Sequence, residues 1–134
     1  MVRYYSDSSV EVLIACDENG SGATTVMAQI AATVLELPIE NIKVIKGDTI
    51  LTPFDNYSAS SRTTYTTGNA VMIAAQEVKD KLQEAAAREV GVHKSKVEVH
   101  GAKAKILGSD IQEINISELF KNTSPFEQGC WGLQ

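Results

Sequence analysis

Residues 10–46 read VEVLIACDENGSGATTVMAQIAATVLELPIENIKVIK. The apolar, β-rich run from Val10 to Cys16 predicts a buried strand, and a glycine-containing turn follows it. The stretch that begins near Thr24 carries apolar residues at helical spacing and stops before Pro38, which predicts an amphipathic helix. Residues 42–46 predict a second strand. A strand, a helix and a strand joined by short loops indicate a sheet that is covered by a helix.

A second, longer helix is predicted downstream, and Gly91 ends it. Beyond it, residues 96–100 and 102–106 alternate with a period of two beside Gly101, which indicates either an antiparallel pair or one bulged strand. Residues 117–120 predict a short capped helix. The residues that we expect to face the core are Val26, Ile30 and Val34 in the first helix, flanked by Met27, Ala31 and Leu35, and Val71, Ala75, Val78, Leu82 and Ala85 in the second.

These elements predict an α+β fold in which a mixed sheet packs against two amphipathic helices. At 134 residues, with 43% hydrophobic content, the chain is expected to form a single domain over residues 1–134. Its core is expected to span about residues 8–120 of this sequence, and residues 121–134 show no periodicity and are expected to form an irregular tail.

The formal net charge of −5 comes from 12 basic and 17 acidic residues. The basic residues are scattered singly, which argues against nucleic acid or an anionic membrane as a partner. Cys16 and Cys130 lack metal-ligand spacing and suit a reducing cytoplasm, with Cys16 in the core. His93 and His100 have no acidic partner in register, so we expect both on the surface, outside any site. No signal peptide or membrane span is expected.

Two loops carry the residue types that bind anions. Residues 58–71 are mostly Ser, Thr, Tyr and Asn, and they lead directly into the second helix. Residues 17–25, with Gly20, Ser21 and Gly22, join the first strand to the first helix. Backbone N–H groups and hydroxyls at a helix start favour a phosphate group. The alternative is that both are ordinary solvated turns that supply helix caps and positive φ angles.

The order of the motifs adds a resemblance. The chain resembles part of the molybdenum-binding subunit of the xanthine dehydrogenase, aldehyde oxidase and carbon monoxide dehydrogenase family. The resemblance covers residues 10–90, and the later strands and the short helix fit its continuation. The motifs that carry it are Gly20-Ser21-Gly22 with Thr25, Ala28-Gln29-Ile30-Ala31-Ala32, Gly47-Asp48-Thr49 with Thr52-Pro53, Ser61-Arg62-Thr63-Thr64-Tyr65, and Thr67-Gly68-Asn69-Ala70-Val71.

This resemblance implies the fold of the molybdopterin-binding domain and an oxidoreductase activity, the hydroxylation or oxidation of small molecules at molybdenum. The cofactor would be molybdopterin, as a dinucleotide, bound only in the assembled enzyme. The glycine turn would face the oxo ligand of the metal, and the hydroxyl-rich loop would hold the pterin or its phosphate. The implied partners are the remaining segments of the molybdenum subunit, an iron–sulfur subunit and a flavin subunit. The implied cofactor-binding residues are Gly20, Ser21, Gly22, Ser60, Ser61, Arg62, Thr63 and Thr64.

The sequence departs from the family at two points. Ser21 stands where the family typically has Gln, and its shorter side chain would need a water molecule to reach a metal ligand. No segment matches the one that carries the family's catalytic glutamate, so we assign no catalytic residue and no metal ligand and expect no activity from the chain alone. The alternative function is a non-catalytic module of the same fold that binds a phosphorylated small molecule or a partner protein.

Overall fold

The computed structural model describes residues 1–16, 18–47, 50–52, 62–108 and 112–121. The first sheet is mixed, with strand order β1-β2-β3. Strand β2 (Val10–Ile14) pairs antiparallel with β1 (Val2–Tyr4) and parallel with β3 (Ile42–Lys46). The predicted strands are therefore confirmed, although β2 ends two residues earlier than expected. The sequence analysis did not predict β1.

Helix α1 (Ala23–Leu35) connects β2 to β3 through the 3₁₀ turn η1 (Ile39–Asn41). Its most buried line holds Met27, Ala31 and Leu35, whereas Val26, Ile30 and Val34 are only partly buried. The predicted inward face is therefore confirmed, but its centre lies on the three residues that were expected only to flank it. The helix is packed from two sides, by the sheet and by a second helix, and the small residues Ala28, Ala31 and Ala32 let its neighbours approach closely.

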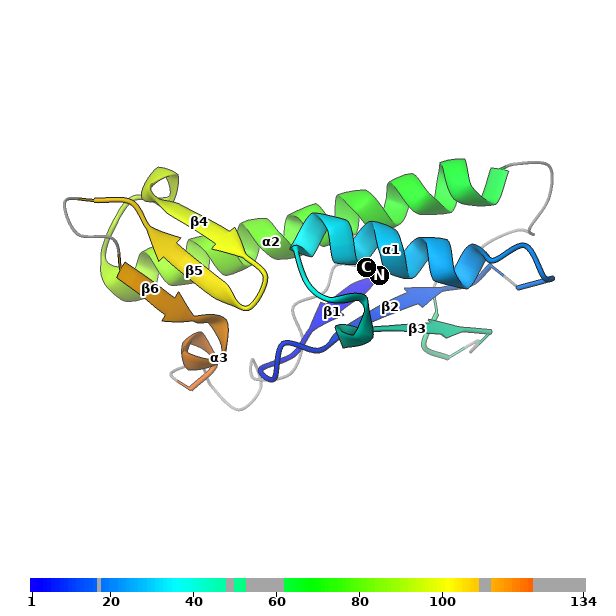
Figure 1. Cartoon of the computed structure of the whole chain (residues 1–134), viewed down its shortest axis with the longest axis horizontal. Coiled ribbons are helices and arrows are strands. Elements are labelled where there is room, and N and C mark those ends of the chain that lie inside the picture. Colours follow the sequence, from blue (N-terminus) through cyan, green and yellow to red (C-terminus); the bar gives the residue numbers. More distant parts are fainter. Residues whose placement is uncertain (17, 48–49, 53–61, 109–111, 122–134) are drawn as a thin grey trace.

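Helix α2 (Gly68–Val90) runs beside α1 and follows the π-helical turn η2 (Thr63–Thr67). Both helices begin at the right-hand end of the molecule in Figure 1 and run in the same direction. Gly91 ends α2 with φ +72°, as predicted. The predicted core residues Val71, Ala75, Val78 and Leu82 are buried, and Ala86 occupies the core in place of Ala85, which is only partly buried.

The second sheet lies on the C-terminal half of α2 (Figure 1) and has the order β4-β5-β6. After the turn η3 (Lys94–Lys96), strands β4 (Val97–His100) and β5 (Lys103–Ile106) form an antiparallel pair. This decides between the two arrangements that the sequence allowed. Strand β6 (Gln112–Asn115) and helix α3 (Ile116–Leu119) complete the described chain. One core contains residues from both sheets and all three helices.

Two groups of side-chain contacts connect the part of the chain that holds the first sheet to the part that holds the second. The Tyr4 and Phe120 rings stack at a centroid distance of 6.3 Å, which joins β1 to the end of α3. At the end of α1, Glu36 has φ +56° and its carboxylate accepts hydrogen bonds from Lys79 Nζ at 2.6 Å and pairs with His100 Nδ1 at 2.6 Å. His100 also lies 3.4 Å from a carboxylate oxygen of Glu98.

The exposed position predicted for His100 is confirmed, but the expectation that it has no acidic partner was wrong. Glu36 is 64 residues away in the sequence, so no local pattern could have revealed it. Hydrogen bonds to Glu36 and then to Glu98 raise the pKa of His100. Among the described residues, no helix combines the length and the apolarity that crossing a bilayer requires.

Gly101 is expected to be the least tolerant of substitution among the glycines that the structure describes. It has φ +58°, its amide donates to Leu35 O at 3.2 Å, and an added Cβ would lie 2.7 Å from Glu36 O. Gly91 has a similar φ of +72° with open space around it, so it is the matched control. Gly91→Ala should cost about 1–2 kcal/mol of unfolding free energy, and Gly101→Ala about 3 kcal/mol or more because overlap adds to the backbone cost. Urea unfolding of both variants measures the difference, and equal losses would contradict the assigned clash.

Removal of the Glu36 carboxylate should lower the pKa of His100. A raised pKa means that the ion pair stabilises the folded state fully below the ordinary value of 6.5 and that this contribution is lost as the pH rises through the folded-state pKa. An NMR titration of the His100 ring should show a larger fall in pKa for Glu36→Gln than for Glu98→Gln. Equal effects of the two variants would show that the Glu36 contact is not the dominant one.

Candidate functional site

The glycine turn between β2 and α1 is closed by its own acidic residue. One carboxylate oxygen of Glu18 accepts the backbone N–H groups of Gly20 and Gly22, each at 2.9 Å, and the other accepts the N–H of Thr24 at 2.9 Å. The Ser21 hydroxyl donates to the same group at 3.4 Å. Three of the backbone donors that the sequence analysis offered to a bound anion therefore already have an anionic partner.

Positive φ angles make this geometry possible. Gly20 has φ +91° and Gly22 has φ +75°, a conformation that glycine adopts without a steric penalty and that turns successive N–H groups to one side. The hydrogen bonds, led by the one from Thr24, lower the pKa of Glu18 to about 2. The start of α1 therefore carries a full negative charge at neutral pH, which complements the positive end of the helix dipole.

Sequence reasoning missed Glu18. The signal that could have revealed it is an acidic residue two positions before a Gly-X-Gly turn at a helix start, because such a carboxylate can reach the amides that follow it. Gly20, Ser21 and Gly22 are all exposed at this turn.

The second predicted loop enters α2 through a π-helical turn. The Gly68 N–H faces the carbonyl oxygens of Thr63, Thr64 and Tyr65, and π-helical turns occur frequently at functional sites. Arg62 and Thr64 are exposed and Thr63 is partly exposed. The predicted site residues Ser60 and Ser61 lie outside the described residues.

The structure places the described parts of both loops at one end of the molecule. Turn η2 contacts α1, and a Cβ added to Gly68 would lie 3.0 Å from Ile30 Cδ1, so a glycine at this position allows α2 to begin close against α1. Since the two helices run in parallel (Figure 1), the turn that precedes Gly68 lies toward the N-terminus of α1. Arg62, Thr63 and Thr64 therefore share this end with the glycine turn.

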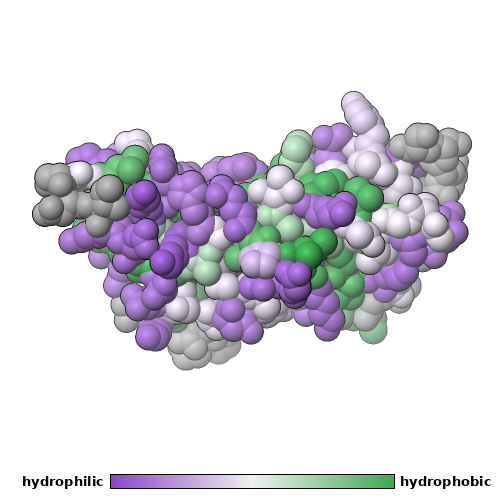
Figure 2. Space-filling view, in the orientation of Figure 1, coloured by the Kyte–Doolittle hydropathy of each residue, from purple (hydrophilic) through white to green (hydrophobic). Residues whose placement is uncertain are grey.

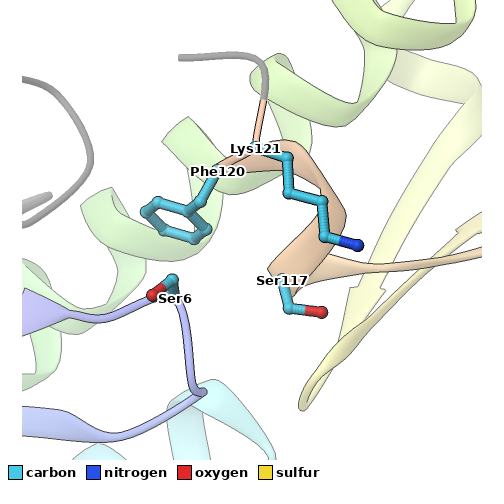
Figure 3. A pocket seen from close by; sticks show the side chains of 4 residues that line it. All are labelled: Ser6, Ser117, Phe120 and Lys121. Atoms are coloured by element: carbon cyan, nitrogen blue, oxygen red, sulfur yellow. The ribbon is translucent and has the colours of Figure 1, made fainter. Parts of the chain in front are cut away.

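A cavity of about 350 Å³ lies elsewhere, between the β1–β2 turn and α3. Ser6, Ser117, Phe120 and Lys121 line it (Figure 3). Helix α3 is far from the glycine turn along the length of the molecule (Figure 1), so this cavity is not part of the predicted site. Within the described ranges, no group of three or more His, Cys, Asp or Glu side chains is placed to hold a metal ion.

The unusual acidity of Glu18 is directly measurable. A carboxylate with a lowered pKa stabilises the folded state above its ordinary pKa of 4.5, and this contribution is lost as the pH falls toward about 2. Carbon-detected NMR of the Glu18 carboxyl group should therefore show a midpoint near 2. Glu18→Gln should lose less stability between pH 5 and pH 2 than the parent chain, and Glu84→Gln, an exposed change on α2, should behave like the parent. A Glu18 midpoint near 4.5 would contradict the observed hydrogen bonds.

Comparison with known proteins shows the family. The family described as the molybdopterin cofactor-binding domain matches residues 1–131. The chain is 34% identical over 97 residues to the carbon monoxide dehydrogenase large chain of Afipia carboxidovorans, covering 72% of this chain and 12% of that protein. It is 35% identical over 107 residues to subunit gamma of the 6-hydroxypseudooxynicotine dehydrogenase complex of Paenarthrobacter nicotinovorans, covering 80% of this chain and 13% of that protein.

A solved structure agrees with the sequence relatives. The structure of a Cu,Mo-containing carbon monoxide dehydrogenase superposes with a TM-score of 0.80 at 29% identity, covering 96% of this chain and 17% of that one. The predicted fold class and family are thereby confirmed, and the chain spans about an eighth of the length of the curated relatives named above. The chain belongs to the molybdopterin cofactor-binding domain family and corresponds to a fragment of the large subunits of molybdenum hydroxylases.

Proposed function

We propose that this chain supplies one wall of the molybdopterin site of an oxidoreductase of the molybdenum hydroxylase type. The observation that supports it is the family match over residues 1–131, together with two donor-bearing turns at the starts of parallel helices. The cofactor, when bound, supplies the redox chemistry by which a small substrate is hydroxylated or oxidised. The chain itself binds and orients the cofactor, and it contributes no catalytic glutamate.

The proposal assigns different tasks to the two turns. Glu18 already occupies amides of the glycine turn and holds a negative charge there, so a phosphate at that turn would meet repulsion. The hydroxyls of Thr63 and Thr64 and the charge of Arg62 suit an anion better. We therefore assign the pterin phosphate, in a dinucleotide form of the cofactor, to Ser60, Ser61, Arg62, Thr63 and Thr64.

The glycine turn then acts by its shape. Gly20, Ser21 and Gly22 would lie on the metal side of the cofactor, and Ser21 would reach a metal ligand there through a water molecule. The donor set fits a group with both a neutral ring system and an anionic end. The turn that carries Glu18 would hold the neutral part, and the hydroxyls of η2 would hold the anionic part.

The proposed partners follow from the relatives. The two curated relatives are named as a large chain and as a subunit of a complex. We propose that this chain works with the remaining segments of a molybdenum subunit and with iron–sulfur and flavin subunits. We place the assembly in the cytoplasm, because the spacing of Cys16 and Cys130 in the sequence gives no disulfide framework, which suits a reducing compartment.

The test is the cofactor content of the assembled protein. The chain is co-expressed with the genes that neighbour it, and molybdenum and pterin are measured in the purified complex. A double variant, Thr63→Val with Thr64→Val, should lower pterin occupancy at limiting cofactor about tenfold or more, because a hydrogen bond to a charged group contributes roughly 1.5–3 kcal/mol. Thr33→Val is the matched control, since this exposed hydroxyl donates to Gln29 O on α1.

Two results would overturn the proposal. The parent complex could contain neither molybdenum nor pterin, which would favour the non-catalytic module. Alternatively, the double variant could retain the pterin occupancy of the parent, which would show that these two hydroxyls do not bind the cofactor. Calorimetry of the isolated chain with nucleotides separates the alternatives further, because a half-site should bind them very weakly and a complete binding module should not.

A further inference from the structure

Helix α2 is divided into an uncharged half and a charged half. Residues 63–76, which include η2 and the first turns of α2, contain no Asp, Glu, Lys or Arg. Residues 19–35, which form most of the glycine turn and all of α1, contain none either. The rest of α2 carries seven charged residues, Glu77, Lys79, Asp80, Lys81, Glu84, Arg88 and Glu89.

The uncharged half of α2 also exposes large apolar side chains. Tyr65 is 77% exposed, Met72 is 45% exposed and Ile73 is 57% exposed. Met72 and Ile73, together with exposed Asn69, lie on the side of α2 away from the core line of Val71, Ala75 and Val78, because positions three and four apart share a helix face. Tyr65 is exposed in the π-helical turn that directly precedes them. We call these four residues, Tyr65, Asn69, Met72 and Ile73, the apolar stripe.

Further along α2, the same side of the helix carries polar and charged residues instead. Gln76 Nε2 donates to Asp80 Oδ1 at 3.2 Å, and Glu84 is exposed further along. Figure 2 shows that, on the face in view, hydrophobic residues are more frequent among hydrophilic ones over the half that holds α1, whereas the other half is mostly hydrophilic. Water-facing helix surfaces normally carry charged residues, as the second half of α2 does.

We propose that the apolar stripe is the surface on which the rest of the molybdenum-binding subunit packs. This rests on the proposed function and names the partner surface for it. The structural alignment with the solved relative covers 96% of this chain but only 17% of the relative. In that relative, the same fold is therefore a small part of a much larger polypeptide. An exposed helix segment that carries large apolar side chains and no charged residue favours an apolar, uncharged polypeptide surface as its counterpart.

The position of the stripe favours this occupant over a second copy of the chain. Tyr65 belongs to η2, and it follows Arg62, Thr63 and Thr64 directly in the sequence. A surface that covers the stripe therefore also borders the proposed phosphate site. Under the proposed function, the remaining segments of the subunit complete the cofactor site that this chain supplies in part, so they border η2, whereas a second copy would bring only another partial site.

The experiment uses Tyr65 and Met72 as natural probes. Hydroxyl-radical footprinting with mass spectrometry compares the isolated chain with the same residues in the assembled molybdenum-binding subunit. Packing of the stripe should reduce the oxidation rate of Tyr65 and Met72 by about fivefold or more. Ile73→Glu should reduce the yield of assembled subunit by about tenfold, and Glu84→Gln should leave it within about twofold of the parent. Circular dichroism and unfolding of the isolated variants should match the parent, because Ile73 is largely exposed there.

The outcomes separate this inference from the proposed function. If the subunit assembles with Tyr65 and Met72 still as reactive as in the isolated chain, or if Ile73→Glu assembles like the parent, the stripe is not the interface. A dimer of the isolated chain that protects the stripe and that Ile73→Glu converts to monomer would assign it to a second copy instead. If the chain does not assemble with the rest of the subunit, the inference that the stripe is their interface is also overturned. Assembly with a protected stripe but without pterin would overturn the proposed function and leave the interface in place.

Discussion

The parallel packing of α1 against α2 is the contact on which the rest of the structure depends. Alanines on α1 and Gly68 at the start of α2 let the helices approach closely. Because the helices run in parallel, both N-termini lie at one end, and two turns that are about forty residues apart in this sequence become neighbours in space. The first sheet covers one side of this pair, and the second sheet covers the C-terminal half of α2. An antiparallel arrangement of the same helices would have separated the turns.

Much of this fold could be predicted from local pattern. The strand, helix and strand of residues 10–46, the existence of a second long helix and its end at Gly91 follow from periodicity and from glycine, and they are confirmed. The inward face of α1 was predicted, but its centre lies on Met27, Ala31 and Leu35, which were expected only to flank it. Periodicity identifies an apolar helix face but cannot show that a sheet and a second helix pack on it from different directions. Strands β1 and β6 were not predicted, since each is only three or four residues long and short strands depend on their pairing partners.

The candidate site was predictable in outline and less so in its chemistry. The residue types of both turns indicated donors at helix starts, and the structure places the described ones at the same end. Glu18 changes what the first turn can do, because its carboxylate takes the place that an external anion would have at Gly20, Gly22 and Thr24. The pairing of His100 with Glu36 was missed for a different reason, since the sequence separation of the two residues hides a contact that the fold creates.

The π-helical turn at the start of α2 has a geometric consequence. A π-helix holds more residues in each turn than the α-helix that continues it, so the turn takes up one residue in excess of the regular spacing. One residue corresponds to a rotation of about 100° around the axis of an α-helix. The orientation of Thr63 and Thr64 relative to the packed side of α2 is therefore independent of the periodicity that buries Val71 and Ala75. Evolution can rotate the functional edge by gaining or losing a single residue here, without repacking the interior.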